Sequence, residues 1–219
     1  RGDPTAPDYL YAKLRIVFDG KQAHAAGIAS TNIPGLANVR LFFSFQLEPE
    51  EIMISCDVPC AYSQTERTGR FDLDKRIYAE LPYPMWPYDA ITAMLSTGYI
   101  GNLYGRIDAG LQHEIDRNKH LNSKGYRNCK LEPAFIIGKG QRSCVLTDDF
   151  ITIGTDAPAH EFYGVLVDRY SEKPGDLKKE IVGANWTSFN GALIRRIGNQ
   201  IQWSTRRAIE EALARANAT

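Results

Sequence analysis

The sequence predicts an α+β protein in which antiparallel sheets pack against two long amphipathic helices. Two observations favour this class: runs in which apolar and polar side chains alternate, and two segments whose apolar residues recur every four positions. Each helical segment follows a block of strands, so the chain has a possible two-half β-β-β-α organisation. Residues 1–8 are expected to form a flexible leader, and residues 9–219 a single domain with possible pseudo-repeat halves 9–124 and 125–219.

Alternation predicts the first block of strands. These strands are expected at 10–18, 39–47, 52–58 and 70–81. The polar connection Glu48-Pro49-Glu50-Glu51 has the length of a turn and contains proline. It therefore predicts that the second and third strands pair as an antiparallel hairpin.

The first long helix is predicted to begin near Tyr88, because three prolines stop the strand before it. It is expected to continue to about His120, with a kink or break near 97–101, where glycines weaken the helical pattern. Its core-facing side is predicted from the apolar row Ile107, Leu111 and Ile115.

A second block of strands follows, and a second long helix closes the chain. Strands are predicted at 130–137, 143–147, 150–153 and 162–167. Gly138-Lys139-Gly140 is typical of a hairpin turn between the first two. A short helix is expected from Pro174 to Gly183, and the long helix from Trp186 to about Ala214.

The composition restricts the classes of partner. The net charge is zero, so we expect no general attraction to nucleic acid or to anionic membranes. No apolar run reaches the roughly 20 residues that a transmembrane segment needs. The chain starts with Arg1-Gly2-Asp3 rather than methionine, which suggests a removed leader or a trimmed start. This tripeptide also matches a short adhesion motif, but three residues discriminate weakly.

The cysteines indicate a compartment. Cys56, Cys60, Cys129 and Cys144 make an even number, which favours two disulfides in a secreted or periplasmic protein. Their pairing stays open, and a metal site or four reduced thiols are the alternatives. Asn185 and Asn217 begin glycosylation sequons, which matter only in a eukaryotic secretory pathway.

The most unusual local composition is an aromatic loop. Tyr83, Met85, Trp86 and Tyr88 lie among three prolines, and such a stiffened apolar edge could bind a ligand, a partner or a lipid surface. The alternative is that these side chains attach the start of the helix to the sheet. We take the four residues as the candidate ligand-binding site.

Asp156 and His160 are the alternative catalytic candidates. They are predicted to lie in a loop between strands, where a carboxylate beside an imidazole could act as a general base. A recognisable nucleophile motif is absent from the sequence. Asp148 and Asp149, nearby, fit turn chemistry equally well, since aspartate favours turns for backbone reasons.

Two further groups have simpler explanations. His113, Asp116 and His120 could share one face of a helix and approach a metal, but the wheel places them opposite the apolar row, in water. Four arginines could form a basic stripe on the last helix, or only its solvated face. They are Arg195, Arg196, Arg206 and Arg207.

The expected function is a non-enzymatic extracytoplasmic carrier for an apolar or amphipathic small molecule, because long helices over one-sided sheets can enclose an apolar groove. No cofactor and no metal are expected. A hydrolase using Asp156 and His160 is one alternative. An envelope-associated or other protein–protein interaction component, using the aromatic loop or the arginines, is the second.

Overall fold

The computed structural model describes residues 33–62, 64–65, 77–79, 97–99, 109–171 and 177–217. They form antiparallel sheets and helices, which confirms the predicted α+β class. The largest sheet has six strands in the order β4-β5-β6-β7-β1-β8. These strands are β1 (Glu51–Asp57), β4 (Arg127–Asn128), β5 (Phe135–Gly138), β6 (Gln141–Leu146), β7 (Asp149–Thr155) and β8 (Lys178–Ile181). Strand β1 lies between β7 and the edge strand β8, so the sheet joins segments that lie far apart in the chain.

Two smaller sheets and the helices complete the described fold. A three-stranded sheet contains β9 (Thr187–Phe189), β10 (Ala192–Ile197) and β11 (Gln200–Ser204). A separate pair contains β2 (Ile77–Ala79) and β3 (Thr97–Tyr99). The helices are α1 (Leu36–Ser44), α3 (Ala109–Ser123), α4 (Asp156–Tyr170) and α5 (Arg206–Asn217).

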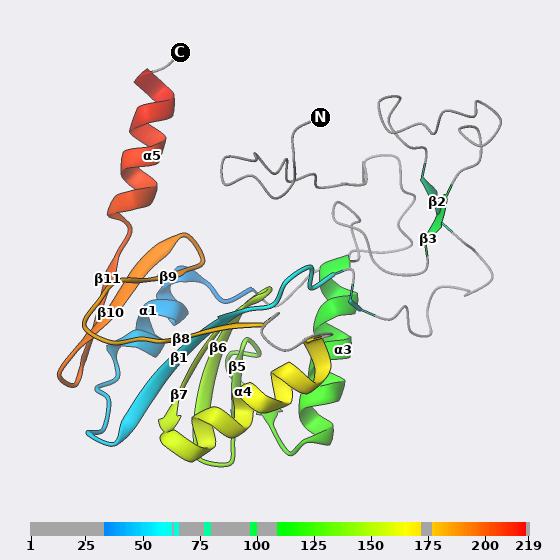
Figure 1. Ribbon diagram of the computed structural model, residues 1–219, viewed down its shortest axis with the longest axis horizontal. Coiled ribbons are helices and arrows are strands. Elements are labelled where there is room, and N and C mark those ends of the chain that lie inside the picture. Colours follow the sequence, from blue (N-terminus) through cyan, green and yellow to red (C-terminus); the bar gives the residue numbers. More distant parts are fainter. Residues whose placement is uncertain are drawn as a thin grey trace, which may run out of the picture.

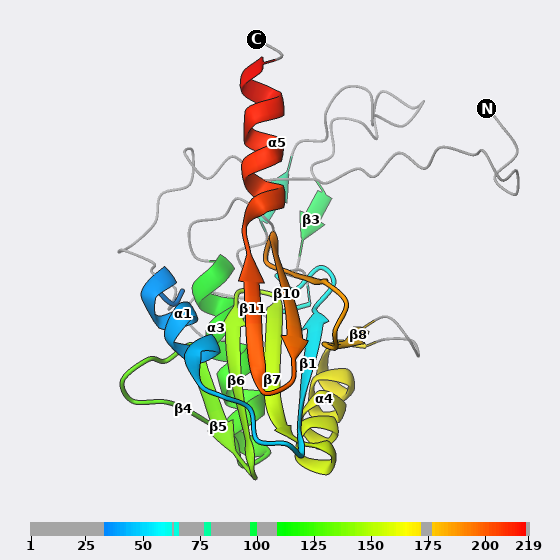
Figure 2. The ribbon, with the colours of Figure 1, turned by 90° about the vertical axis from the view of Figure 1, so that its left-hand side faces the viewer.

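The six-stranded sheet is covered on both faces. Helices α3 and α4 lie against one face, and α1 and the three-stranded sheet lie against the other (Figures 1 and 2). Helix α5 projects away from these layers (Figure 2). Along the chain, β1, α3, the β6–β7 hairpin, α4 and β8 form a β-α-β-β-α-β unit. Its hairpin lies beside β1.

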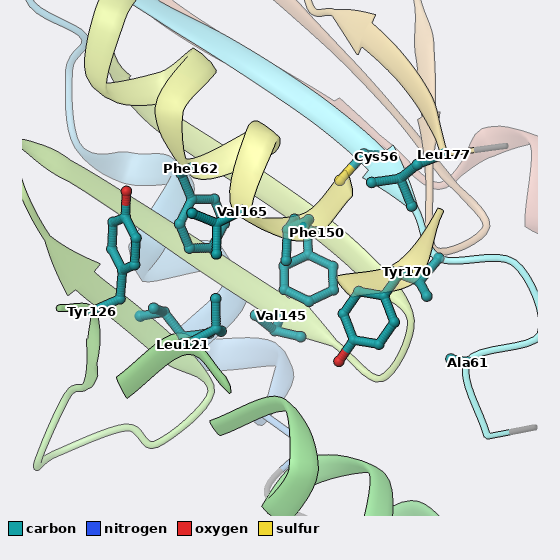
Figure 3. Close-up of a cluster of buried hydrophobic side chains, with 13 residues drawn as sticks. Cys56, Ala61, Leu121, Tyr126, Val145, Phe150, Phe162, Val165, Tyr170 and Leu177 are labelled. Carbon is teal, nitrogen blue, oxygen red and sulfur yellow. The ribbon is translucent and has the colours of Figure 1, made fainter. Parts of the chain in front are cut away.

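Each face of the sheet has its own apolar core. On the helix side, Val145 and Phe150, which are direct partners across β6 and β7, pack with Phe162 of α4 and Leu121 of α3 (Figure 3). On the other side, Met53 of β1 packs with residues of α1 and of the small sheet. Successive strand residues therefore serve opposite cores, as the pleat requires.

The predicted strand at 39–47, and its hairpin with 52–58, are wrong. Residues 36–44 form α1, and β1 pairs with β7 and β8 instead. Alternation would have placed Phe42 on the opposite face from Val39 and Phe43. A helix buries all three, at spacing i, i+3 and i+4.

The first long helix is also shorter than predicted. Residues 97–99 form a strand, with Gly98 opposite Tyr78, and α3 begins at Ala109. The predicted inner face is reversed as well. Ile115 is 45% exposed, whereas His113 and Arg117 are buried, because this side of α3 meets polar groups of the surrounding segments.

The predicted terminal helix is mostly sheet. Phe189, Leu193 and Ile197 lie in β9 and β10, and the helix covers only 206–217. A four-residue spacing fits the helical repeat, but it is also a multiple of the two-residue strand repeat. Asn190-Gly191 decides between them, since φ values of +43° and +75° form a tight hairpin turn.

In the second block, the predicted strands 143–147 and 150–153 correspond to β6 and β7, and the predicted strand 130–137 is confirmed only from Phe135 onward. The hairpin at Gly138-Lys139-Gly140 is confirmed, because Gly138 pairs with Gln141. The predicted strand 162–167 lies within α4, and the described part of the predicted helix 174–183 contains β8. The β-branched and aromatic residues of 162–167 favour strands locally, but here Phe162, Val165 and Leu166 are buried on one face of a helix.

Several predictions lie outside the described residues. These are the leader 1–8, the strand 10–18 and the aromatic loop 83–88. The pseudo-repeat halves stay a prediction.

Candidate functional site

Three aspartates meet where β1 ends and β7 begins, at one end of the strands of the six-stranded sheet. We call this position the aspartate edge. Asp57 is the last residue of β1, and its direct partner across the antiparallel pair is Asp149, the first residue of β7. Asp148 precedes it in the β6–β7 turn, and its carbonyl oxygen accepts a 2.9 Å hydrogen bond from the backbone N–H of Val58. The end of β1 and this turn are therefore held together.

Strand alternation directs two of these side chains to the same face. Cys56 and Phe150, the next residues inward, belong to the core beneath the helices. Asp57 and Asp149 therefore point to the opposite face, toward the three-stranded sheet. Like charges directly opposite one another destabilise a sheet, so this pairing has a cost that the fold tolerates.

A cation borders the same position. Lys178 of β8 is the direct partner of Asp57 on the side away from Asp149. Asp57 and Lys178 are exposed, whereas Asp149 is half-buried. The edge thus combines carboxylate oxygens with one exposed ammonium group.

The backbone of the turn is strained. Thr147 has φ +61° at the first central position of a two-residue turn, where glycine is usual. A β-branched residue in this region is an outlier, and such strain gathers at functional sites. The strain lies directly before the two aspartates.

The electrostatics follow from this crowding. Burial, then the charges of Asp148 and Asp57, raise the pKa of Asp149 to about 7. The backbone N–H of Asn190, in the β9–β10 turn, donates a hydrogen bond to Asp149 and opposes the rise. Burial, then the charges of Asp149 and Asp57, raise the pKa of the Cys56 thiol to about 12, so it is a neutral core residue.

The donor set suits hard divalent cations, which prefer carboxylate oxygen ligands. Within the described part of the chain, no three His, Cys, Asp or Glu side chains are already arranged around one point. A cation at this edge would therefore have to draw the aspartates together. The exposed position of Asp57 leaves space for its carboxylate to turn.

The site residues predicted from the sequence lie elsewhere. Tyr83, Met85, Trp86 and Tyr88 are outside the described residues. Asp156 and His160 lie at the start of α4, not in a loop. They approach each other, with 3.4 Å between Nδ1 and Oδ1, but the Asp156 side chain is 79% exposed. This pair is a surface contact within one helical turn.

His113, Asp116 and His120 do not converge on a metal. The Nδ1 atom of His113 lies 3.0 Å from the Thr65 hydroxyl, Asp116 forms an ion pair of 2.6 Å with Arg169, and His120 contacts a backbone carbonyl of α4. The prediction that all three are solvated is wrong for His113, which is 1% exposed.

The four arginines do not form one stripe. Arg195 and Arg196 lie on β10, while Arg206 and Arg207 lie on α5. The Arg195 guanidinium stacks 4.4 Å from the Trp186 ring centroid, Arg196 bonds to the backbone carbonyl of Glu51, and Arg206 pairs with Glu210 at 2.6 Å.

The predicted disulfides are absent, and all four cysteines, each within the described residues, are free thiols. Cys56 and Cys144 are buried in different cores, on opposite faces of the sheet. Cys60 is exposed in a turn and Cys129 is partly buried after β4. Sheet pleating therefore separates the two buried sulfurs, and the argument from an even cysteine count fails.

The sequence carried one signal for the aspartate edge: an acidic pair between two β-patterned runs, Ser143–Thr147 and Phe150–Ile153. Its connection to Asp57 required the pairing of β1 with β7.

Comparison with known proteins adds little. No protein-family model matches the chain, and no curated protein matches it significantly. A solved structure of telomerase from Candida albicans, in complex with a fragment of telomeric RNA, is 10% identical, with a TM-score of 0.38. The match covers 79% of this chain and 36% of that one. At this TM-score the similarity carries no argument about function. Among the described helices, none is both long and apolar enough to span a bilayer.

Proposed function

We propose that the protein is a divalent-cation-dependent phosphoryl-transfer enzyme, with Asp57, Asp148 and Asp149 as its metal ligands. The observation that carries this proposal is the direct cross-strand pairing of Asp57 with Asp149, next to Asp148 in a strained turn. Sites of two metal ions held by carboxylates serve phosphatases, nucleases and polymerases. Bound cations would offset the repulsion between the aspartates.

The surroundings favour a phosphate substrate over a purely structural cation site. Lys178 flanks Asp57 and would place a positive charge beside a phosphate group. The exposed positions of Asp57 and Lys178 make the edge open to solvent. Small-molecule sites are usually concave, so an open edge suits an extended substrate such as a nucleic acid strand.

We therefore propose nucleotidyl transfer to a strand end as the reaction. The acceptor hydroxyl loses its proton to solvent, its oxygen bonds to the α-phosphorus of a nucleoside triphosphate, and pyrophosphate leaves. The metal ions would polarise the phosphate and stabilise the attacking and leaving oxygens. Asp57, Asp148 and Asp149 position the ions, and Asn190 fixes the Asp149 carboxylate.

This proposal departs from the expectation of a non-enzymatic protein without metal or nucleic acid partner. A net charge of zero describes the whole chain, whereas recognition depends on the local arrangement of charges. The carrier function stays a separate proposal, because its aromatic contact residues lie outside the described part of the chain. The extracytoplasmic location stays a prediction as well.

The test is extension of a labelled primer on RNA and DNA templates, with nucleoside triphosphates and Mg²⁺ or Mn²⁺. We expect extension that requires the cation and is lost in Asp149→Asn. Asp156→Asn is the matched control, since Asp156 is an exposed aspartate outside the site. Cleavage of the strand instead of extension would identify a nuclease. No cation-dependent reaction with any of these substrates would refute the proposal.

A further inference from the structure

The segment after β1 covers the strained turn. Besides the hydrogen bond from Val58 to Asp148, the Thr147 side chain hydrogen-bonds to Tyr62. Further along, the Thr65 hydroxyl donates to the Ala61 carbonyl at 3.1 Å, and Thr65 is fully buried. The described parts of this segment thus touch the turn at two points.

His113 of α3 closes this arrangement from the helix side. Its ring lies 5.8 Å from the Tyr62 ring and 5.9 Å from the Tyr170 ring, between centroids. Burial, then the charge of Arg117, lower the pKa of His113 to about 4, while the backbone of Thr147 acts in the opposite direction. The imidazole is therefore neutral at pH 7 and lies near the Thr147 backbone.

The hydrogen bonds define the tautomer. The Thr65 hydroxyl has one proton and gives it to Ala61, so it can only accept from His113. The Nδ1 atom of His113 therefore carries the proton. Nε2 reaches no partner at hydrogen-bonding geometry, and the groups that act on the ring from the backbone are the acceptor carbonyls of Thr147 and Ala61. A buried ring nitrogen without a hydrogen-bond partner destabilises the folded state, and an apolar side chain would avoid this cost. The presence of a histidine here therefore suggests a role beyond packing.

We propose that His113 is a positioning residue of the aspartate site: it holds Thr65, and with it the segment after Asp57, against the Thr147 turn that directs Asp148 and Asp149. This inference rests on the proposed metal-dependent function. His113 contacts neither substrate nor metal. It acts through Thr65 and the backbone of the turn.

The test measures Mn²⁺ affinity by titration calorimetry, so that it does not depend on catalytic turnover. Loss of a residue that supports metal ligands typically costs 10- to 100-fold in metal affinity. We expect His113→Leu to weaken Mn²⁺ binding by about tenfold or more. We expect His113→Asn, whose amide can replace Nδ1–H, to retain most of it. Leu121→Ala is the matched control, because Leu121 is buried on the same helix and belongs to the apolar core.

A second pair of variants covers the case in which His113→Leu does not fold. Thr65→Val removes the hydroxyl and should weaken Mn²⁺ binding as His113→Leu does. Thr65→Ser keeps the hydroxyl and should bind Mn²⁺ as the wild type does. Unchanged affinity in Thr65→Val would overturn the positioning role while leaving the metal site intact. A wild-type protein that binds no Mn²⁺, or binds it equally well as Asp149→Asn, would overturn both proposals.

Discussion

The two ends of β1 place carboxylates in opposite electrostatic surroundings. At the start, burial acts to raise the pKa of Glu51, but hydrogen bonds from Arg142 and the Glu48 backbone, with the charge of Arg142, hold it below 4.5. The Nη2 atom of Arg142 lies 3.0 Å from Oε2. At the other end, Asp57 faces Asp149, whose pKa rises to about 7.

The difference separates a structural carboxylate from a candidate functional one. Glu51 is neutralised by a side chain of the protein, so its charge supports the fold. Asp149 lies beside further acids, and the N–H of Asn190 opposes their effect without neutralising the carboxylate, so a proton or a cation from solution would balance its charge. Variants at each end of one strand can test this contrast.

The largest expected effect concerns activity at the aspartate end. Asp57→Asn and Asp149→Asn should each lower cation-dependent nucleotidyl transfer by about 100-fold or more, since each loses several kcal/mol of charge stabilisation through the metal ions. The double variant should be little worse than either single one, because ligands of one site act as a unit. Steady-state primer extension measures this. Strictly multiplicative losses would argue against a shared site.

The next effect is a pH trend in stability. Folding raises the pKa of Asp149 from 3.8 to about 7, so the folded state binds the extra proton between these values. The stabilisation is complete below pH 4 and is lost as the pH rises through 7. Wild type should therefore lose about 1–3 kcal/mol relative to Asp149→Asn between pH 4 and pH 8, after allowance for solvent screening.

Urea unfolding at several pH values measures this trend. Saturating Mg²⁺ should reduce the loss in wild type, because binding to the folded state adds stability. If the difference in unfolding free energy between wild type and Asp149→Asn does not change between pH 4 and pH 8, the raised pKa of Asp149 is contradicted.

At the opposite end, Glu51→Gln should lower the free energy of unfolding by about 1–2 kcal/mol at pH 7, because Arg142 loses its charged partner. The pKa of Glu51 is lowered by folding, so this stabilisation is present above pH 4.5 and lost as the pH falls below it. Urea unfolding at pH 7 and pH 3 distinguishes the two conditions. Metal affinity should not change, and a weakened affinity would show that the two ends are coupled.

The smallest effect is expected away from β1. Asp156→Asn should change stability by no more than about 0.5 kcal/mol, because Asp156 is an exposed residue in the first turn of α4. Thermal unfolding at low and high salt checks this. A larger effect, or a loss of nucleotidyl transfer, would restore Asp156 and His160 as functional candidates.

Local patterns in the sequence were sufficient where neighbouring residues alone determine a strand or a turn. The run at 52–58 alternates and falls in β1, and the short apolar runs at 143–147 and 150–153 fall in β6 and β7. Gly138-Lys139-Gly140 supplies the backbone freedom that its hairpin needs, with φ values of +50° and +78° at the last two residues. The α+β class followed from such signals.

Local patterns misled where one spacing fits both a helix and a strand, and where a buried side chain has a polar partner from another segment. The four-residue row from Phe189 fits both a helix and a strand, and only the Asn190-Gly191 turn separates them. His113 was assigned to water because the helical wheel places it opposite an apolar row, yet its partner Thr65 comes from another segment. Burial depends on what lies opposite, which a helical wheel does not contain.

By itself, the sequence determined that Asp57 belongs to a strand and that Asp148 and Asp149 lie where one strand turns into the next, because alternation and turn chemistry are properties of neighbouring residues. Only the tertiary structure decided that β1 pairs with β7 in a register that places Asp57 opposite Asp149. Register depends on which distant strands share their backbone hydrogen bonds and apolar faces. The candidate site arises from that choice.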